Sequence, residues 1–173
     1  MVYFVLTGIV LALFRRRNPL TILMVELKVP FLMIACLIIQ LVLAYFALQK
    51  GLYYPVILNT TFVLMLLCLF LNRHLQGVKW IFLGTLLNTL ALILHNGFMP
   101  VSETALKITG LEGNFEGDSR HRSMGSTHFW WLGDWIPFIT PVGTNYVMSL
   151  GDIFVGVGII LFIVRNSLKG QKE

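Results

Sequence analysis

The chain has 173 residues, of which 57% are hydrophobic and only 12% are charged, and its mean hydropathy is +0.80. A water-soluble domain of this length cannot bury so much apolar surface, so the composition predicts a single-domain integral membrane protein. The net charge of +5 does not indicate nucleic-acid binding, because the lysines and arginines stand at the ends of apolar runs without interleaved aromatic residues.

Five apolar segments are predicted to cross the membrane, which makes the expected fold an all-α helical bundle. A spanning helix needs roughly 20 apolar residues, with about 17 as the lower limit. The predicted spans are residues 2–14, 29–48, 55–71, 78–94 and 147–164. Whether the short first segment crosses completely is left open. Between the first two spans, Asn18 as an N-cap followed by Pro19 predicts a short helix along the inner face.

The basic residues predict the orientation of the chain. Nine of them fall on one side of this five-span arrangement: Arg15, Arg16, Arg17, Lys28, Arg73, Lys79, Arg165, Lys169 and Lys172. Four fall on the other side: Lys50, Lys107, Arg120 and Arg122. Because basic residues accumulate in the cytoplasm, we expect a multi-pass protein of the bacterial cytoplasmic membrane with its N-terminus outside, its C-terminus inside and the loop of residues 96–146 outside.

Asp152 lies just inside the last predicted span. A helix beginning after it would be about 18 Å long, too short for a hydrocarbon core roughly 30 Å thick. We therefore expect Asp152 one turn below the outer boundary, where an ionisable group is costly unless it is paired, hydrated or protonated. Ser149 and Asp152 also have the S-x-x-D spacing of a capping box. The sequence leaves a structural cap and a functional carboxylate both open.

A second carboxylate, Asp134, stands in the aromatic stretch "HFWWLGDWIPFITP" of the outer loop. Tryptophan collects at the headgroup level of membranes, so this stretch is predicted to lie at the outer interface and to return Asp134 toward the bundle. One interpretation is a solvated aspartate in a Gly-Asp turn. The other is that Asp134 and Asp152 face each other in a partly desolvated pocket, share a proton and divide into a general acid and a general base.

Other polar groups of the same end complete the candidate site. In "HNGFMPVS", after the fourth span, Asn96 either ends the helix together with Gly97 or donates a hydrogen bond to a ligand. Asn96, His128 and Ser149 are the candidate substrate-binding residues, and Asn59 and Asn88 are expected to form interhelical hydrogen bonds. No cofactor or metal is predicted, because neither the histidines nor the two cysteines have a metal-ligand spacing.

Three stretches, "NGFMPVS", "LGDWIP" and "SLGDIFVGVGII", resemble a family of small bacterial membrane proteins of unassigned function, mainly over residues 78–164. More remotely, the layout is similar to the lipoprotein signal peptidases, polytopic aspartic peptidases with two catalytic aspartates near the outer face. Their second aspartate follows a small residue in F-N-x-A-D, and here Gly151 precedes Asp152. Their first occurs in G-N-x-x-D-R, whereas this chain has Trp131 and Trp135 in place of the asparagine and the arginine.

The leading functional hypothesis is therefore a carboxylate-containing polar site at the outer membrane face, with Asp134 and Asp152 as its candidate catalytic pair. The alternatives are an aspartic-peptidase-like membrane hydrolase and a structural or ligand-binding subunit without catalysis. The expected partners are membrane lipid and a membrane-embedded peptide or lipid substrate, and no nucleic acid. The oligomeric state is left open.

Overall fold

The computed structural model describes residues 1–111, 121–125, 128–140 and 143–169. Most of these residues are helical, as predicted. The long helices are α1 (Val2–Phe14), α2 (Pro30–Lys50), α3 (Pro55–Leu71), α4 (Val78–Leu94) and α7 (Leu150–Asn166). The bounds of α1, α3 and α4 agree with the predicted segments. Pro30 and Pro55 occupy the first position of α2 and α3, where a missing N–H costs nothing.

By length and composition, one helix in the described part of the chain, α2, is long and apolar enough to cross a membrane. It has 21 residues, about 31 Å at 1.5 Å per residue, and among them Cys36, Leu43 and Ala47 are buried. The apolar helices α1, α3 and α4 are shorter, with 13, 17 and 17 residues. The five-span arrangement therefore stays a prediction.

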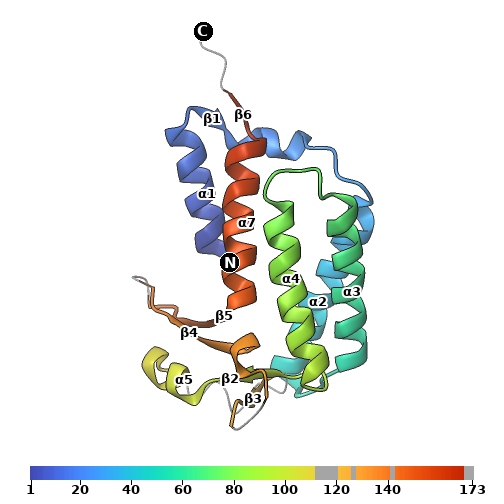
Figure 1. Cartoon of the computed structure of the whole chain (residues 1–173), viewed down its shortest axis with the longest axis vertical. Helices are drawn as coiled ribbons and strands as arrows, with labels where there is room; N and C mark the ends of the chain where they lie inside the picture. The colour runs from blue at the N-terminus through green and yellow to red at the C-terminus, as the bar shows by residue number, and fades with distance from the viewer. Residues whose placement is uncertain (112–120, 126–127, 141–142, 170–173) are drawn as a thin grey trace.

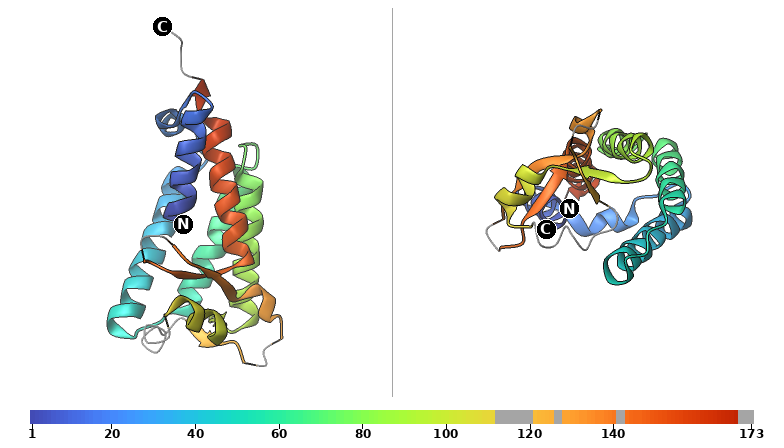
Figure 2. Two further views of the ribbon diagram at one scale, coloured as in Figure 1. Left: turned by 90° about the vertical axis from the view of Figure 1, so that its left-hand side faces the viewer. Right: turned by 90° about the horizontal axis from the view of Figure 1, so that it is seen from below.

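The long helices pack in the spatial order α1, α7, α4, α3 and α2, as Figures 1 and 2 show. The last helix of the sequence, α7, lies between α1 and α4, while α3 packs on α4 and α2 packs on α3. The end of the bundle at which α4 ends and α7 begins is called the sheet end below. The opposite end, which carries Arg15, Arg73 and Arg165, is called the basic end.

Glycines set the close approach of α4 and α7. A Cβ atom on Gly84 would lie 2.3 Å from the carbonyl oxygen of Gly151, and one on Gly77 would lie 2.4 Å from that of Gly158. Both distances are far below van der Waals contact, so only glycine allows the two backbones to approach this closely. The contact between Gly84 and Gly151 also brings Asn88, one turn farther along α4, to the beginning of α7.

At the basic end, Asn18 caps the 3-10 helix η1 (Pro19–Met24), and its side chain accepts a hydrogen bond from the Leu20 N–H. The predicted cap and short helix are therefore present, and the location of this helix along the inner face stays a prediction. The pair β1 (Arg17–Asn18) and β6 (Leu168–Lys169) joins the beginning and the end of the chain. Of the basic residues counted above, Arg120 and Lys172 lie outside the described residues.

The segment predicted as an outer loop contains a small sheet, which the all-α prediction missed. The strands are β2 (Met99–Val101), β3 (His121–Ser123), β4 (Asp134–Phe138) and β5 (Tyr146–Ser149), in the order β3-β2-β4-β5. The short helix α5 (Glu103–Thr109) and the turn η2 (Trp130–Leu132) belong to the same segment. Strands of three to five residues have too little alternation to be recognised in the sequence, and their pairing is non-local.

The predicted last span, residues 147–164, begins three residues too early as a helix. Residues 147–149 belong to β5, and α7 starts at Leu150 with Ser149 as its N-cap. The apolar side chains of Val147 and Met148 continue the hydrophobic run of the helix, so hydropathy alone places the boundary before them. The pairing of Ser149 with Asp134 across the sheet decides where the strand ends and the helix begins.

Candidate functional site

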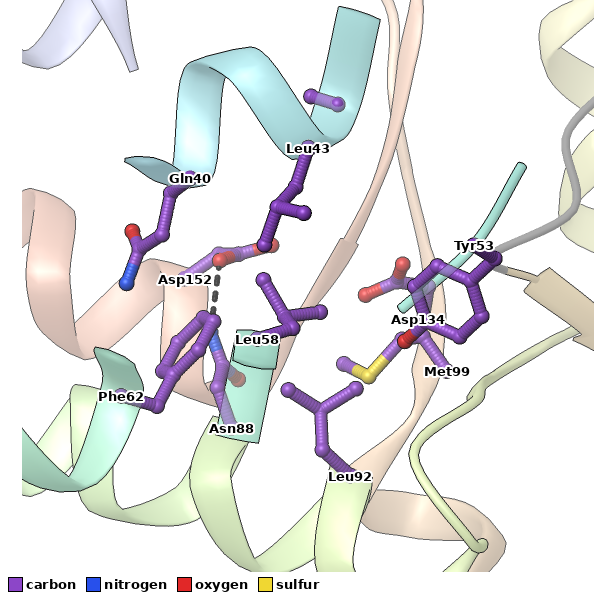
Figure 3. Close-up of a pocket in the computed structure, with 11 residues that line it drawn as sticks. Gln40, Leu43, Tyr53, Leu58, Phe62, Asn88, Leu92, Met99, Asp134 and Asp152 are labelled. Atoms are coloured by element: carbon purple, nitrogen blue, oxygen red, sulfur yellow. Dashed lines mark hydrogen bonds between the residues drawn. The ribbon is translucent and has the colours of Figure 1, made fainter. Parts of the chain in front are cut away.

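One cavity at the sheet end receives both predicted carboxylates (Figure 3). It has a volume of about 320 Å³, at the lower end of the range for small-molecule sites. Helices α2, α3, α4 and α7, the strands β2 and β4 and the α2–α3 connection all contribute to it. This carboxylate cavity is lined, among the described residues, by Gln40, Leu43, Ala44, Tyr53, Leu58, Phe62, Asn88, Leu92, Met99, Asp134 and Asp152.

Asp152 is held by a closed network of hydrogen bonds at the beginning of α7. Its backbone N–H donates to Ser149 Oγ (3.0 Å), and the Ser149 N–H donates to Asp152 Oδ2 (3.3 Å), so the predicted capping box is confirmed. Asn88 Nδ2 donates to Asp152 Oδ1 (3.0 Å), and Ser149 Oγ donates to Asn88 Oδ1 (2.8 Å). The donors to the Asp152 carboxyl group are a backbone N–H and a side-chain amide, which orient it without adding a positive charge beside it.

Asp134 is positioned by the sheet. It is 8% exposed, and its Cα pairs with Val101 in β2 and with Ser149 in β5. The Ser102 N–H donates to the Asp134 carbonyl (2.8 Å). The β4–β5 register shifts between Asp134 and Ile136, which leaves Trp135 as an extra residue on β4. Bulges of this kind redirect the neighbouring side chain, and here the Asp134 side chain reaches the carboxylate cavity.

The two carboxylates therefore reach one cavity from different parts of the fold. In Figure 3, Asp152 lies beside Asn88, while Asp134 lies on the side of the view that also holds Tyr53 and Met99. The side chains of Leu58 and Leu92 stand between these two groups in the view. The arrangement gives the cavity two carboxyl groups set in a mainly apolar lining.

Asn96 and His128 are not among the residues that line the carboxylate cavity. Asn96 is exposed and, with Gly97, adopts the left-handed conformation that ends α4 (φ 56° and 87°). His128 is exposed, and its carbonyl oxygen lies 3.0 Å from Nε2 of His95. The helix-ending interpretation of Asn96 is therefore the one that the geometry supports.

Sequence reasoning missed three polar members of the lining. Asn88 forms the expected interhelical hydrogen bonds. The sequence did not indicate that its partners are Ser149 and Asp152, which place Asn88 in the cavity lining. Gln40 donates to Thr61 Oγ1 (3.3 Å), and the Tyr53 hydroxyl donates to the Gly97 carbonyl. Gln40 is the one amide within residues 30–48, the apolar run of α2. This isolated amide was the available signal for a polar residue in the lining. For Asn59, the side-chain oxygen is buried without a hydrogen-bond partner among the described residues.

Asp152 also lines a second cavity, of about 180 Å³, on the side of α1. This aromatic cavity contains Tyr3, Phe4, Phe138 and Tyr146, whose rings contact one another with centroid separations of 6.0–6.4 Å. The first turn of α7 thus separates two cavities that share one carboxylate. Within the described part of the chain, no group of three or more histidine, cysteine or acidic side chains is arranged to hold a metal ion.

Comparison with known proteins identifies relatives but no mechanism. Residues 24–164 match a family described as "Family of unknown function (DUF5317)". An uncharacterised protein of Thermotoga maritima is 34% identical over 122 residues, which covers 69% of this chain and 69% of that protein. No solved structure matches this chain.

Proposed function

The chain belongs to DUF5317, a family of unknown function, and we propose that it is a multi-pass membrane protein that binds an amphiphilic ligand in the carboxylate cavity. One observation carries the proposal: Asp134 from the sheet and Asp152 from α7 line a single cavity together with apolar side chains of α2, α3 and α4.

The surface of the helices supports the membrane placement. Large apolar side chains point outward along α2 and α3, for example Phe31 (85% exposed), Leu41 (71%) and Val56 (76%). Exposed apolar surface on this scale is unfavourable in water and favourable in lipid. Helices α3, α4 and α7 have 17 residues each, which meets the lower limit for a membrane span. The distribution of basic residues favours a cytoplasmic location of the basic end.

The first prediction tests this orientation with single cysteines. Thr104, on α5 at the sheet end, and His74, at the basic end, are both exposed, whereas the natural Cys36 and Cys68 are buried. A membrane-impermeant maleimide should label Thr104→Cys in intact cells and His74→Cys only after the membrane is opened, because the reagent cannot cross the bilayer. Labelling of His74→Cys alone in intact cells would reverse the orientation, and labelling of both would argue against a membrane barrier between the two ends.

The lining defines the chemical class of the ligand. Leucine, phenylalanine and methionine side chains suit an alkyl body, and the charged side chains among the described lining residues are both carboxylates. A positively charged or strongly hydrogen-bond-donating head group is therefore the complementary partner. Asp152 is already oriented by neutral donors, so a cationic head group meets a fixed carboxylate and little ordering is needed on binding.

The second prediction follows from this charge complementarity. In lipid nanodiscs at neutral pH, purified protein should bind dodecylammonium at least about 10-fold more tightly than dodecanol, which has the same chain but no charge. The gain in thermal stability at increasing concentrations of each amphiphile measures both affinities. Equal stabilisation by the two amphiphiles would show that only the alkyl chain is recognised, and the proposed role of the carboxylates would be wrong.

A membrane hydrolase of the aspartic type is the second candidate, and the shared cavity is the observation that favours it. Two carboxylates in one partly apolar site can divide into a proton donor and a base that activates water. The capping interactions of Asp152 suit either role, because they leave the carboxylate in the cavity wall. Turnover of a lipidated peptide is the property that separates a hydrolase from a binding protein.

A further inference from the structure

A third cavity, at the basic end, has a different character. It has a volume of about 450 Å³ and lies where the α3–α4 turn meets the last turns of α7. This basic cavity is lined, among the described residues, by Arg73, His74, Leu75, Gln76, Gly77, Lys79, Trp80, Leu161 and Arg165. Three of these residues are basic (Arg73, Lys79 and Arg165) and none is acidic, so the cavity is complementary to an anion.

The α3–α4 turn that presents these groups is held in place by side-chain hydrogen bonds. Asn72 is completely buried, and its side chain accepts from the Lys28 N–H (2.7 Å) and donates to the carbonyl oxygens of Lys28 (2.9 Å) and Cys68 (2.8 Å). Asn166 Nδ2, at the end of α7, donates to the Gln76 carbonyl (2.9 Å). These bonds hold the backbone of the α3–α4 turn against the α1–α2 connection and the end of α7.

One cation of the cavity is restricted by an aromatic contact, and an arginine outside the cavity lining binds the end of α7. The Arg73 guanidinium lies 4.2 Å from the centre of the Phe70 ring, which restricts it through a cation–π contact. Arg17 donates to the carbonyl oxygens of Ser167 (2.8 Å) and Arg165 (3.2 Å) at the end of α7. These bonds satisfy carbonyl groups at the end of α7, which is the negative end of that helix dipole. Helix α4 begins at Val78, so the positive end of its dipole also lies here.

One side of the basic cavity is apolar, which distinguishes a lipid from a soluble anion. Trp80 is 43% exposed and stacks on Phe154 of α7 (centroids 5.6 Å apart, planes 12° apart), and Leu161 also lines the cavity. Tryptophan at the end of an apolar helix is typical of the headgroup level of a membrane. An occupant with a phosphate at the cations and an alkyl chain along α4 and α7 satisfies both surfaces.

We infer that the basic cavity binds the phosphate-bearing headgroup of an anionic phospholipid. The inference uses the membrane placement proposed above but is independent of the carboxylate cavity at the opposite end of the bundle. Basic cavities between helices on the cytoplasmic side of membranes are suited to such headgroups, and each basic residue near the surface contributes about a fivefold gain in affinity for anionic lipid.

The test uses purified full-length protein in dodecyl maltoside, with phosphatidylglycerol as the anionic lipid and phosphatidylcholine as the zwitterionic comparison. Native mass spectrometry measures the affinity for each lipid. Wild-type protein should prefer phosphatidylglycerol at least about 10-fold. The triple variant Arg73→Gln, Lys79→Gln, Arg165→Gln should bind phosphatidylglycerol roughly 100-fold more weakly, because three cations are removed at about fivefold each.

The control is a matched triple variant, Arg15→Gln, Arg16→Gln, Lys28→Gln. It removes the same charge from exposed positions at the same end that do not line the basic cavity. It should stay within about threefold of wild type. Equal losses in both triple variants, or no preference for phosphatidylglycerol in the wild type, would overturn the inference. Displacement of the lipid by millimolar inorganic phosphate would assign the cavity to a soluble phosphate instead. If the triple variant does not fold, Lys79→Gln alone should still lower the affinity about fivefold.

Discussion

Replacing Gly84 by valine is expected to destabilise the protein by about 3 kcal/mol or more and to lower its thermal midpoint by about 10 °C. A Cβ atom at this position would lie 2.3 Å from the Gly151 carbonyl oxygen and 2.6 Å from the Val155 nitrogen. Both are backbone atoms, which cannot move out of the way as a flexible side chain would. The helices α4 and α7 must therefore separate, and Asn88 would be drawn away from Ser149 and Asp152.

The control for this prediction is Val157→Ile on the partner helix α7, which enlarges an exposed side chain (37% exposed) and should leave the midpoint within about 2 °C of wild type. The measurement is thermal unfolding in detergent. A wild-type midpoint for Gly84→Val would mean that α4 and α7 do not approach through Gly84 and Gly151. The positions of Asn88 and Asp152 relative to each other would then be in doubt as well.

Two substitutions of Asp152 should separate its structural role from its ligand-binding role. Asp152→Asn keeps a side chain that caps α7 and should cost about 1 kcal/mol or less. Asp152→Ala removes the acceptor for the Ser149 N–H and for Asn88 Nδ2, and should cost about 2–3 kcal/mol. Both variants lose the negative charge, so both should bind dodecylammonium at least about 10-fold more weakly than wild type.

Asp134→Asn should weaken binding of dodecylammonium to a similar degree, whereas Glu103→Gln is the matched control because Glu103 is an exposed carboxylate of the sheet end outside the cavity lining. Thermal unfolding and amphiphile titration of all variants are the measurements. Wild-type affinity in both aspartate variants would contradict the binding proposal. Cleavage of a lipidated peptide by wild type that disappears in both Asp→Asn variants would favour the hydrolase, and non-additive stability in the double variant would indicate that the carboxylates interact.

Part of the candidate site is local in the sequence and could be predicted from it. The capping box joins residues three apart, and the spacing of Ser149 and Asp152 indicates it without any knowledge of the fold. Asn96 was harder to interpret, because a helix-ending asparagine and a ligand-binding one occur in the same sequence context. His128 was selected for its chemistry and its neighbours in the chain, and the structure places its side chain outside the cavity lining.

The sequence by itself determined where the long helices lie, because apolar runs, helix-starting prolines and helix-ending glycines act on the backbone within a few residues. The bounds of Pro55–Leu71 and Val78–Leu94 were predicted to the residue. The tertiary structure alone decided which polar groups meet. Asn88 bonds to Asp152 over a separation of 64 residues, because Gly84 and Gly151 let two helices touch there. Asp134 reaches the same cavity because a strand register with a bulge places it opposite Ser149. Hydrogen bonds between residues so far apart in the chain depend on which helix and strand surfaces pack together. That packing depends on side-chain shape and burial throughout the bundle, which no local sequence pattern specifies.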